Sequence, residues 1–224
     1  MTDRTAVQQR RSITFARLVP LAGVAYCVLT LAGDLTIGEF PDASTPPAEL
    51  SRYYVTHADS VRLGGQLMIL AALCLGLFGL AVWARVRDTA GPPMVAGLML
   101  VGTSVAVTAE LGGAGAYVLL GSMGADQTVA PAALQAWQAG SQFGGGGATL
   151  FMVGLFAAGV FSRALPAWLS WSALILGIAE LTQFGFYASM LALLWTAVAG
   201  IVLAVRPLDR APTGRADLAQ PPRA

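Results

Sequence analysis

Positive charge is scarce in this chain, and none of it comes from lysine. The 13 basic residues are all arginine, they face 12 acidic residues, and charged residues make up only 11% of the 224 residues, against roughly 25% in soluble domains. Without lysine, the chain has no phosphate-binding Gly-Lys-Ser/Thr loop. A net charge of +1 provides no broad basic face, so nucleic acid is excluded as a partner.

Histidine and cysteine are also rare. His57 is the only histidine, which rules out paired-imidazole haem ligation and His-rich zinc sites. We interpret it as a surface residue, with a pH-sensitive partnership to an acid as the alternative. Cys27 and Cys74 lie in apolar runs, where cysteine behaves as a small hydrophobe and a disulfide is not expected. No serine or cysteine has a nucleophile motif, so we predict a protein that is not an enzyme and holds no cofactor or metal.

Apolar residues, by contrast, account for 56% of the chain. Crossing the roughly 30 Å of membrane hydrocarbon takes about 20 apolar residues in a helix, and six stretches qualify. The sequence therefore predicts an all-α, polytopic transmembrane helix bundle as a single domain over residues 1–206, followed by a disordered cytoplasmic tail over 207–224. The predicted spans lie near residues 18–37, 63–84, 94–120, 143–161, 165–187 and 188–205, with a very short turn between the last two.

The positions of the arginines predict that both termini are cytoplasmic, because cytoplasmic flanks are enriched in positive charge. In this orientation eleven arginines lie inside and only Arg52 and Arg62 outside. A cleaved export signal around Arg10 and Arg11 is the alternative interpretation of the N-terminus. The five apolar runs that follow favour an uncleaved first span.

Two outer segments are expected to be helical. Thr45, a candidate N-cap, is followed by Pro46 and Pro47, and this pattern predicts an amphipathic helix over residues 49–58 that lies on the outer membrane surface. A second outer helix is predicted over residues 131–140.

Short segments recur in the same order along the chain. Each outward-running span has one carboxylate in a similar local setting, at Asp34, Glu110 and Glu180, and the inward-running spans share Gly-Leu-Phe at residues 76–78 and 154–156. These matches predict a parallel repeat of helical hairpins related by an axis along the membrane normal, with the third hairpin as a degenerate copy. Chance matching among Gly, Ala, Leu and Phe is the alternative.

The three intramembrane acids carry the functional hypothesis. A carboxylate within hydrocarbon costs at least about 2.5 kcal/mol, so these side chains should face one another or water. With at most one arginine nearby, at least one acid should be protonated at neutral pH, or a cation should bind between them. The alternative is that protonated glutamates simply hydrogen-bond between helices. The predicted ligand- or proton-binding site consists of Asp34, Gln66, Glu110, Glu180, Gln183 and Arg62.

The glycines allow two interpretations. Residues 144–147 could unwind the fourth span and expose backbone carbonyls to a ligand. The favoured interpretation is close helix packing, which would also apply to Gly76, Gly79 and the glycines of residues 112–115.

The order of these features resembles families of six-span bacterial integral membrane proteins that are classed as domains of unknown function. The resemblance rests on a tyrosine pair, Tyr53 and Tyr54, after the first span, on Leu-Pro-Ala-Trp-Leu-Ser-Trp at residues 165–171, and on Gly185 and Phe186 in the last turn. It implies a multi-pass protein of the bacterial cytoplasmic (inner) membrane, and it implies no activity.

Two functions follow from the sequence. The first is a small proton- or cation-linked transport or ligand-binding protein with an outward-facing acidic site. The alternative is a non-enzymatic membrane scaffold or regulatory partner, whose glycine faces pack on a second copy or on another membrane protein. A membrane enzyme acting on lipid or quinone lacks a recognisable nucleophile or metal set.

Overall fold

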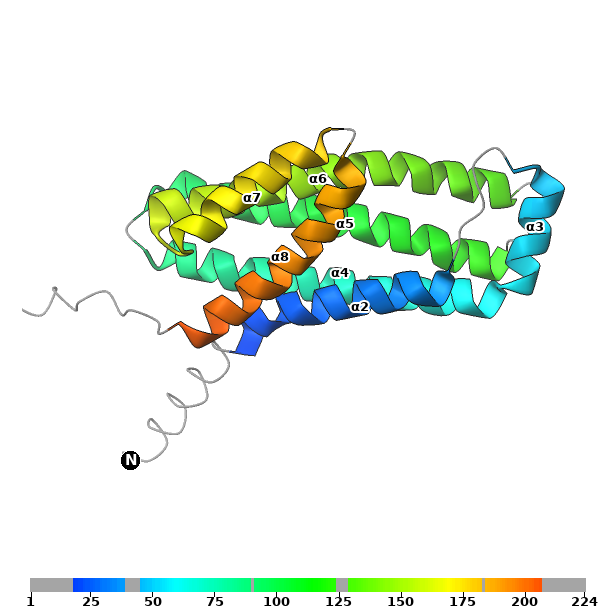
Figure 1. Ribbon diagram of the computed structural model, residues 1–224, viewed down its shortest axis with the longest axis horizontal. Helices are drawn as coiled ribbons and strands as arrows, with labels where there is room; N and C mark the ends of the chain where they lie inside the picture. Colours follow the sequence, from blue (N-terminus) through cyan, green and yellow to red (C-terminus); the bar gives the residue numbers. More distant parts are fainter. Residues whose placement is uncertain (1–17, 39–44, 90, 124–128, 183, 207–224) are drawn as a thin grey trace, which may run out of the picture.

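The computed structural model describes residues 18–38, 45–89, 91–123, 129–182 and 184–206, and all regular structure within them is helical. The all-α prediction is confirmed for these residues. A 3-10 turn, η1, leads into a series of α-helices (Figure 1). The elements are η1 (Val19–Leu21), α2 (Ala22–Ile37), α3 (Pro47–Thr56), α4 (Ala58–Arg87), α5 (Pro93–Met123), α6 (Val129–Ser162), α7 (Ala167–Glu180) and α8 (Gly185–Val205).

Five segments of the described chain are long and apolar enough to cross a bilayer, which indicates a multi-pass membrane protein. They are Val19–Ile37, Ala58–Arg87, Pro93–Met123, Gly145–Ser162 and Gly185–Val205. The span expected at 165–187 corresponds to a shorter helix, because α7 has 14 residues and ends at Glu180. At a rise of 1.5 Å per residue α7 is roughly 21 Å long, less than the roughly 30 Å of hydrocarbon. By length, the predicted span at 165–187 is therefore not met.

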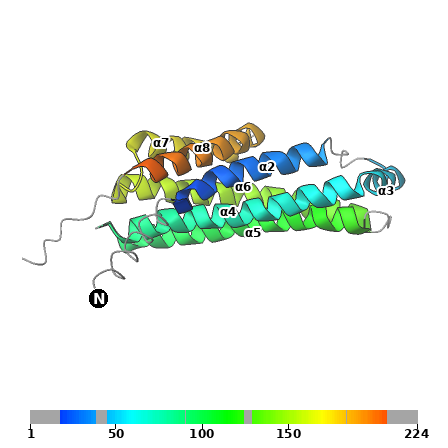
Figure 2. The same cartoon turned by 90° about the horizontal axis from the view of Figure 1, so that it is seen from below.

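Four helices run along the long axis of the bundle, and a shorter hairpin covers one part of it. In Figure 1, α2, α4, α5 and α6 lie lengthwise, α3 lies across one end, and the α7–α8 hairpin stops short of that end. Figure 2 shows α7 and α8 on one side of the bundle and α4 and α5 on the opposite side. Helix α5 packs along α4 and α6, while α2 packs on α4 and α8.

Glycines allow the long helices to approach closely. A Cβ added to Gly102 on α5 would lie 2.9 Å from the Leu150 carbonyl oxygen on α6, and one at Gly65 on α4 would lie 3.0 Å from the Ala114 carbonyl oxygen on α5. Gly79 likewise contacts Thr103. Close packing, the favoured interpretation of the glycines, therefore holds at these crossings.

Other glycines do not fit that interpretation. Gly112 and Gly115 on α5 have nothing within 4 Å of an added Cβ. The alternative expected for the fourth span, unwinding, is not found in the structure, because α6 stays helical through residues 145–147. A helix interior tolerates glycine at a cost of about 1 kcal/mol each, so the run weakens α6 without ending it.

Two apolar clusters form the core. The larger one fills the middle of the bundle and includes Phe78, Met99, Leu155 and Leu203, each with no exposed surface. The smaller one lies under α3 and joins Leu50 and Tyr54 to residues of α2, α4 and α5.

The predicted outer helix at 49–58 is present as α3, over Pro47–Thr56. Its N-cap is Pro46 and no side chain caps it, so Thr45 does not have the expected role. Pro47 occupies the first helical position, where proline needs no N–H partner. Leu50 and Tyr54 are 2% and 1% exposed, so the apolar face of α3 packs on the bundle. This burial, and the neighbouring Tyr53, raise the pKa of the Tyr54 phenol.

The second predicted outer helix, at 131–140, is not a separate element. It forms the first part of α6, which continues to Ser162. Pro131 lies in the first turn of α6, where proline is tolerated, and no further proline occurs before Pro166. The helix therefore has no reason to end at residue 140.

We expect two glycines of α5 to differ in their tolerance of a methyl group. Gly102→Ala should lower the free energy of unfolding by about 1–3 kcal/mol, because its Cβ would press on the α6 backbone. Gly112→Ala is the matched control, and it should be neutral or stabilising by roughly 0.5–1 kcal/mol. Thermal unfolding in mild detergent measures both. Equal effects of the two substitutions would contradict this packing.

Candidate functional site

A cavity of ≈ 260 Å³ lies among α2, α4, α5, α6, α7 and α8, and it is lined by three acidic side chains from three different helices. Asp34 is at the end of α2, Glu110 is in the middle of α5, and Glu180 is the last residue of α7. Asp34 is exposed, Glu110 is half-buried, and Glu180 is 8% exposed. The acids therefore form a series from the surface to the interior.

Helix α2 presents a polar face to the cavity. Tyr26, Thr30 and Asp34 are spaced four residues apart and all line it, because residues at i and i+4 lie one above the other on a helix. The Tyr26 hydroxyl donates a hydrogen bond to Oε1 of Glu110 at 3.0 Å, which connects α2 to α5. The hydroxyl oxygen of Thr30 is buried and has no hydrogen-bond partner in the described residues.

Glu180 lies where the chain reverses between α7 and α8. Backbone hydrogen bonds from Leu181 to Ile178 and from Gly185 to Thr182 hold this turn. The turn brings Ser189 back over Glu180, with its hydroxyl 2.8 Å from Oε2 of the carboxyl. The other carboxyl oxygen, Oε1, is buried and has no hydrogen-bond partner among the described residues. A buried carboxyl oxygen without a partner is unusual and calls for a proton, a water or a ligand.

The rest of the cavity wall is largely apolar. Leu75, Phe151, Met152 and Leu193 contribute side chains from α4, α6 and α8. Among the described residues, no arginine or histidine lines the cavity, and no group of three or more His, Cys, Asp or Glu could hold a metal ion. Neither glutamate forms an ion pair within this part of the chain. The site is acidic, without a countercharge from the described protein.

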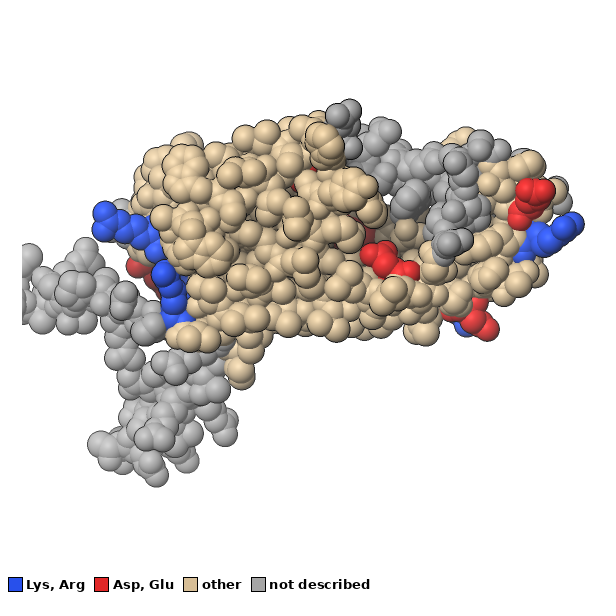
Figure 3. All heavy atoms as spheres, in the orientation of Figure 1, with Lys and Arg blue, Asp and Glu red and all other residues tan. Residues whose placement is uncertain are grey.

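Acidic side chains interrupt an otherwise uncharged surface. In Figure 3, acidic atoms appear in a hollow partway along the molecule, while the other visible charges lie at its two ends. At the end opposite α3, Arg85 donates a hydrogen bond to the Leu203 carbonyl oxygen and Arg87 lies 4.8 Å from the centre of the Trp83 ring. In the view shown, the acidic atoms partway along the molecule are remote from the basic atoms at its ends.

The structure brings together three of the six predicted site residues, Asp34, Glu110 and Glu180. Arg62 and Gln66 do not line the cavity. Both are on the outer face of α4, which continues in the exposed leucines 70, 73, 77 and 80, while the inner face carries Gly65 against α5. The sixth, Gln183, lies outside the described residues.

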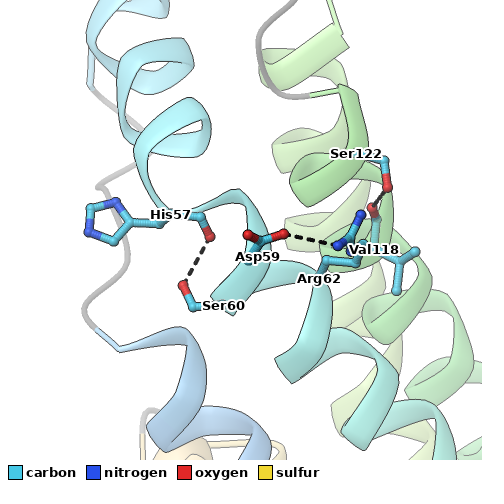
Figure 4. Close-up of polar contacts among 6 residues, drawn as sticks. All are labelled: His57, Asp59, Ser60, Arg62, Val118 and Ser122. Atoms are coloured by element: carbon cyan, nitrogen blue, oxygen red, sulfur yellow. Dashed lines mark hydrogen bonds and ion pairs between the residues drawn. The ribbon is translucent and has the colours of Figure 1, made fainter.

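Arg62 has a local partner instead of a cavity acid. It pairs with Asp59 at 2.9 Å, one turn earlier on α4, and both side chains are more than half exposed (Figure 4). His57, at the junction of α3 and α4, is exposed and its ring stacks on Tyr53. The expected countercharges near the acids are therefore absent from the described cavity wall.

Comparison of the chain with protein-family models, with curated proteins and with solved structures gave no match. The site is accordingly interpreted from its own geometry.

Sequence reasoning did not identify Tyr26, Thr30, Ser189 and Thr196, which also line the cavity. A signal for two of them was present, because Tyr26, Thr30 and Asp34 repeat every four residues in an apolar segment. Ser189 and Thr196 repeat after seven residues on α8, which again places them on one face. Polar periodicity within a span could therefore have pointed to this wall.

The hydrogen bond between Tyr26 and Glu110 should appear as a coupling between the two side chains. In a double-mutant cycle of Tyr26→Phe with Glu110→Ala, we expect a coupling energy of about 0.6 kcal/mol and up to about 1.7 kcal/mol, the range for hydrogen bonds between membrane helices. The measurement is the free energy of unfolding in detergent. Ser104→Ala is the control partner, since its hydroxyl bonds only to its own helix at Leu100. Coupling with Ser104 as large as that with Glu110 would refute the assignment.

Proposed function

We propose that the chain is a small proton- or cation-linked transport or ligand-binding protein of the membrane, with an acidic site that faces outward. The observation that carries this proposal is Glu180: a buried carboxyl with one oxygen that has no partner in the described part of the chain, in the same cavity as Glu110 and Asp34. The proposed role is not enzymatic.

Charge is the first support for this proposal. Removing a carboxylate from water is costly unless an opposite charge accompanies it. No described cationic side chain lines the cavity, so the negative charges of Glu110 and Glu180 call for protons or for a bound cation. Exchange of a bound proton for a bound cation would link cation binding to proton release.

The Ser189 hydroxyl can form a hydrogen bond with Glu180 in both the protonated and the ionised state of the carboxyl. Its hydroxyl lies 2.8 Å from Oε2 of Glu180 and 3.0 Å from the carbonyl oxygen of Gly185. A hydroxyl has a single hydrogen, so it donates to only one of these acceptors at a time. When it donates to Gly185, its oxygen can accept a hydrogen from a protonated Glu180. When Glu180 is ionised, the hydroxyl can donate to it.

The position of Glu180 at the end of α7 supports a cationic ligand further. The free carbonyl groups at a helix C-terminus carry partial negative charge, which attracts cations within the last turn. Glu180 is the C-terminal residue of α7, and its carboxyl lines the cavity. The helix end and the carboxyl therefore favour a positive charge at the same place.

The outward orientation rests on charge distribution. Arg85 and Arg87 lie in the last turn of α4 and Arg206 directly follows α8, and these are the inner ends of both helices if the arginine-rich side is cytoplasmic. In this orientation α7 begins at Ala167 on the cytoplasmic side, so Glu180 at its C-terminal end lies toward the outside. The sequence resemblance adds the bacterial cytoplasmic membrane to this proposal as the location.

Infrared difference spectroscopy between about pH 6 and pH 9, a window in which exposed carboxyl groups with an ordinary pKa of roughly 4 stay ionised, tests the proposal on the purified protein. We expect the carbonyl band of a protonated carboxyl at low pH and its loss at high pH while the helices remain intact. Glu180→Gln and Glu110→Gln should each remove part of this titrating signal. Glu49→Gln, at an exposed glutamate on α3, should leave the signal unchanged. If the signal persists in the double Gln variant, or if the wild type shows no titrating carboxyl, the proposal is wrong.

A second candidate function, a membrane scaffold or regulatory partner, is favoured by the outer face of α5. Gly112 and Gly115 are exposed and have open space around an added Cβ, as glycines do where a helix from another molecule could approach. A homo-oligomer or another membrane protein would be the partner in this case.

Light scattering of the protein in mild detergent tests the second candidate. If α5 mediates association, wild type should be larger than a monomer and Gly115→Leu should dissociate it. Gly146→Leu on α6 is the matched control, since Gly146 also has open space. A monomeric wild type, purified from its membrane without companions, would exclude this function.

A further inference from the structure

The cavity also carries information about the shape of its ligand, given the function proposed above. Its three carboxyl groups do not converge on one point. Within the described residues, no three His, Cys, Asp or Glu side chains are placed to hold a metal ion. A hard cation such as Ca²⁺ requires six to eight oxygen ligands at about 2.3–2.6 Å, so a chelated metal fits this arrangement poorly. The ligand must instead be large enough to reach separate carboxyls.

The burial of the acids suggests two separate positions for positive charge. Glu180 is 8% exposed and Glu110 is half-buried, while Asp34 is exposed at the end of α2. Glu110 lies within electrostatic range of both of the others. A ligand along this series would have one charged end inside and one near the surface.

Part of the cavity wall suits hydrocarbon. Ala106, Ala109, Phe151, Met152 and Leu193 line the cavity beside the carboxyls. They offer no hydrogen-bonding side chains, so the part of the ligand next to them should be apolar. The volume of ≈ 260 Å³ is below the roughly 300–1,000 Å³ typical of sites for drug-sized molecules, which favours a short chain.

Two residues that line the cavity each have a buried oxygen that can accept a hydrogen bond. Oε1 of Glu180 and the hydroxyl oxygen of Thr30 have no hydrogen-bond partner among the described residues. An ammonium group has three N–H donors and no acceptor, so it complements two acceptors that lack a donor. The Tyr26 ring, on the same wall, can add a cation–π contact.

We propose that the cavity binds a short aliphatic diamine in its doubly charged form. The inner ammonium group lies at Glu180 and Glu110, the methylene chain follows the apolar wall, and the outer ammonium group lies at Asp34. Two positive charges then face three carboxyls, and a proton on one carboxyl completes the neutralisation. This inference rests on the proposed function and names the substrate class of its site.

Isothermal titration of the full chain in mild non-ionic detergent tests it with 1,4-diaminobutane, n-butylamine and Mg²⁺ as probes. The diamine should bind at least about tenfold more tightly than butylamine, because the second ammonium gains a charge-assisted contact. Asp34→Asn should reduce the affinity for the diamine to that for butylamine and leave the butylamine affinity unchanged. Thr30→Val should weaken both amines, and Glu49→Gln should weaken neither.

Three results would overturn the diamine assignment. They are equal affinities of the wild type for the two amines, equal weakening of both amines by Asp34→Asn, and displacement of the diamine by equimolar Mg²⁺. If Asp34→Asn does not fold, a series of diamines from three to six carbons replaces it in the wild type. An optimum of affinity at one chain length supports two fixed charge positions, and a flat series contradicts them.

The infrared titration separates this inference from the proposed function. A titrating carboxyl signal that depends on Glu110 and Glu180, together with no diamine binding, overturns the diamine and leaves the proton- or cation-linked function standing. Absence of both overturns both.

Discussion

The structure depends on one electrostatic constraint: carboxyl groups are placed inside an apolar helix bundle without a basic side chain from the described residues. In water such groups would be solvated, and inside a protein they would usually be paired with arginine. Here the arginines of the described chain lie elsewhere, as Arg62 pairs with Asp59 and Arg85 bonds to the end of α8. The acids are left to protons, hydroxyl donors or a bound cation, and each other feature of the site follows from this requirement.

The fold meets the constraint by packing tightly in some places and leaving space in one. Glycines such as Gly65 and Gly102 bring α4, α5 and α6 into close contact. The α7–α8 hairpin is shorter than the other helices and turns after Glu180 (Figure 1). That early turn places Ser189 over the carboxyl, and Tyr26 on α2 supplies the corresponding donor to Glu110. Each glutamate thus has one hydroxyl partner, and space remains beside both.

Much of the fold was accessible from the sequence because apolar length and proline positions have direct structural consequences. Most predicted spans lie within or close to observed helices, and the outer helix after Pro46 is present as α3. The boundaries of α7 and α6 were not accessible, since an apolar sequence through residues 165–187 does not reveal that α7 ends at Glu180 and α8 begins at Gly185, and nothing in 131–140 reveals that the helix continues. Hydropathy measures the solvent that a segment prefers, not where its helix ends.

The acidic residues of the site could be predicted from the sequence, and its other residues could not. A carboxyl in an apolar span is conspicuous in sequence, so Asp34, Glu110 and Glu180 could be grouped by the cost of burying them. Gln66 was grouped with them by depth and Arg62 as the nearest candidate countercharge, and neither criterion determines the face of a helix. Successive residues are about 100° apart around the axis, so Gln66 points outward while the adjacent Gly65 contacts α5.

The same geometry shows that the two candidate functions do not compete for one surface. On α5, Glu110 faces the cavity, and Gly112 is two residues further along, which corresponds to a rotation of about 200° around the helix axis. The open glycines therefore lie on the face of α5 opposite the acid. A partner helix against Gly112 and Gly115 would leave the carboxyls of the cavity uncovered, and a cation at Glu110 would not touch that interface. Association and ligand binding can thus coexist in this chain, coupled only through the packing of α5 between α4 and α6.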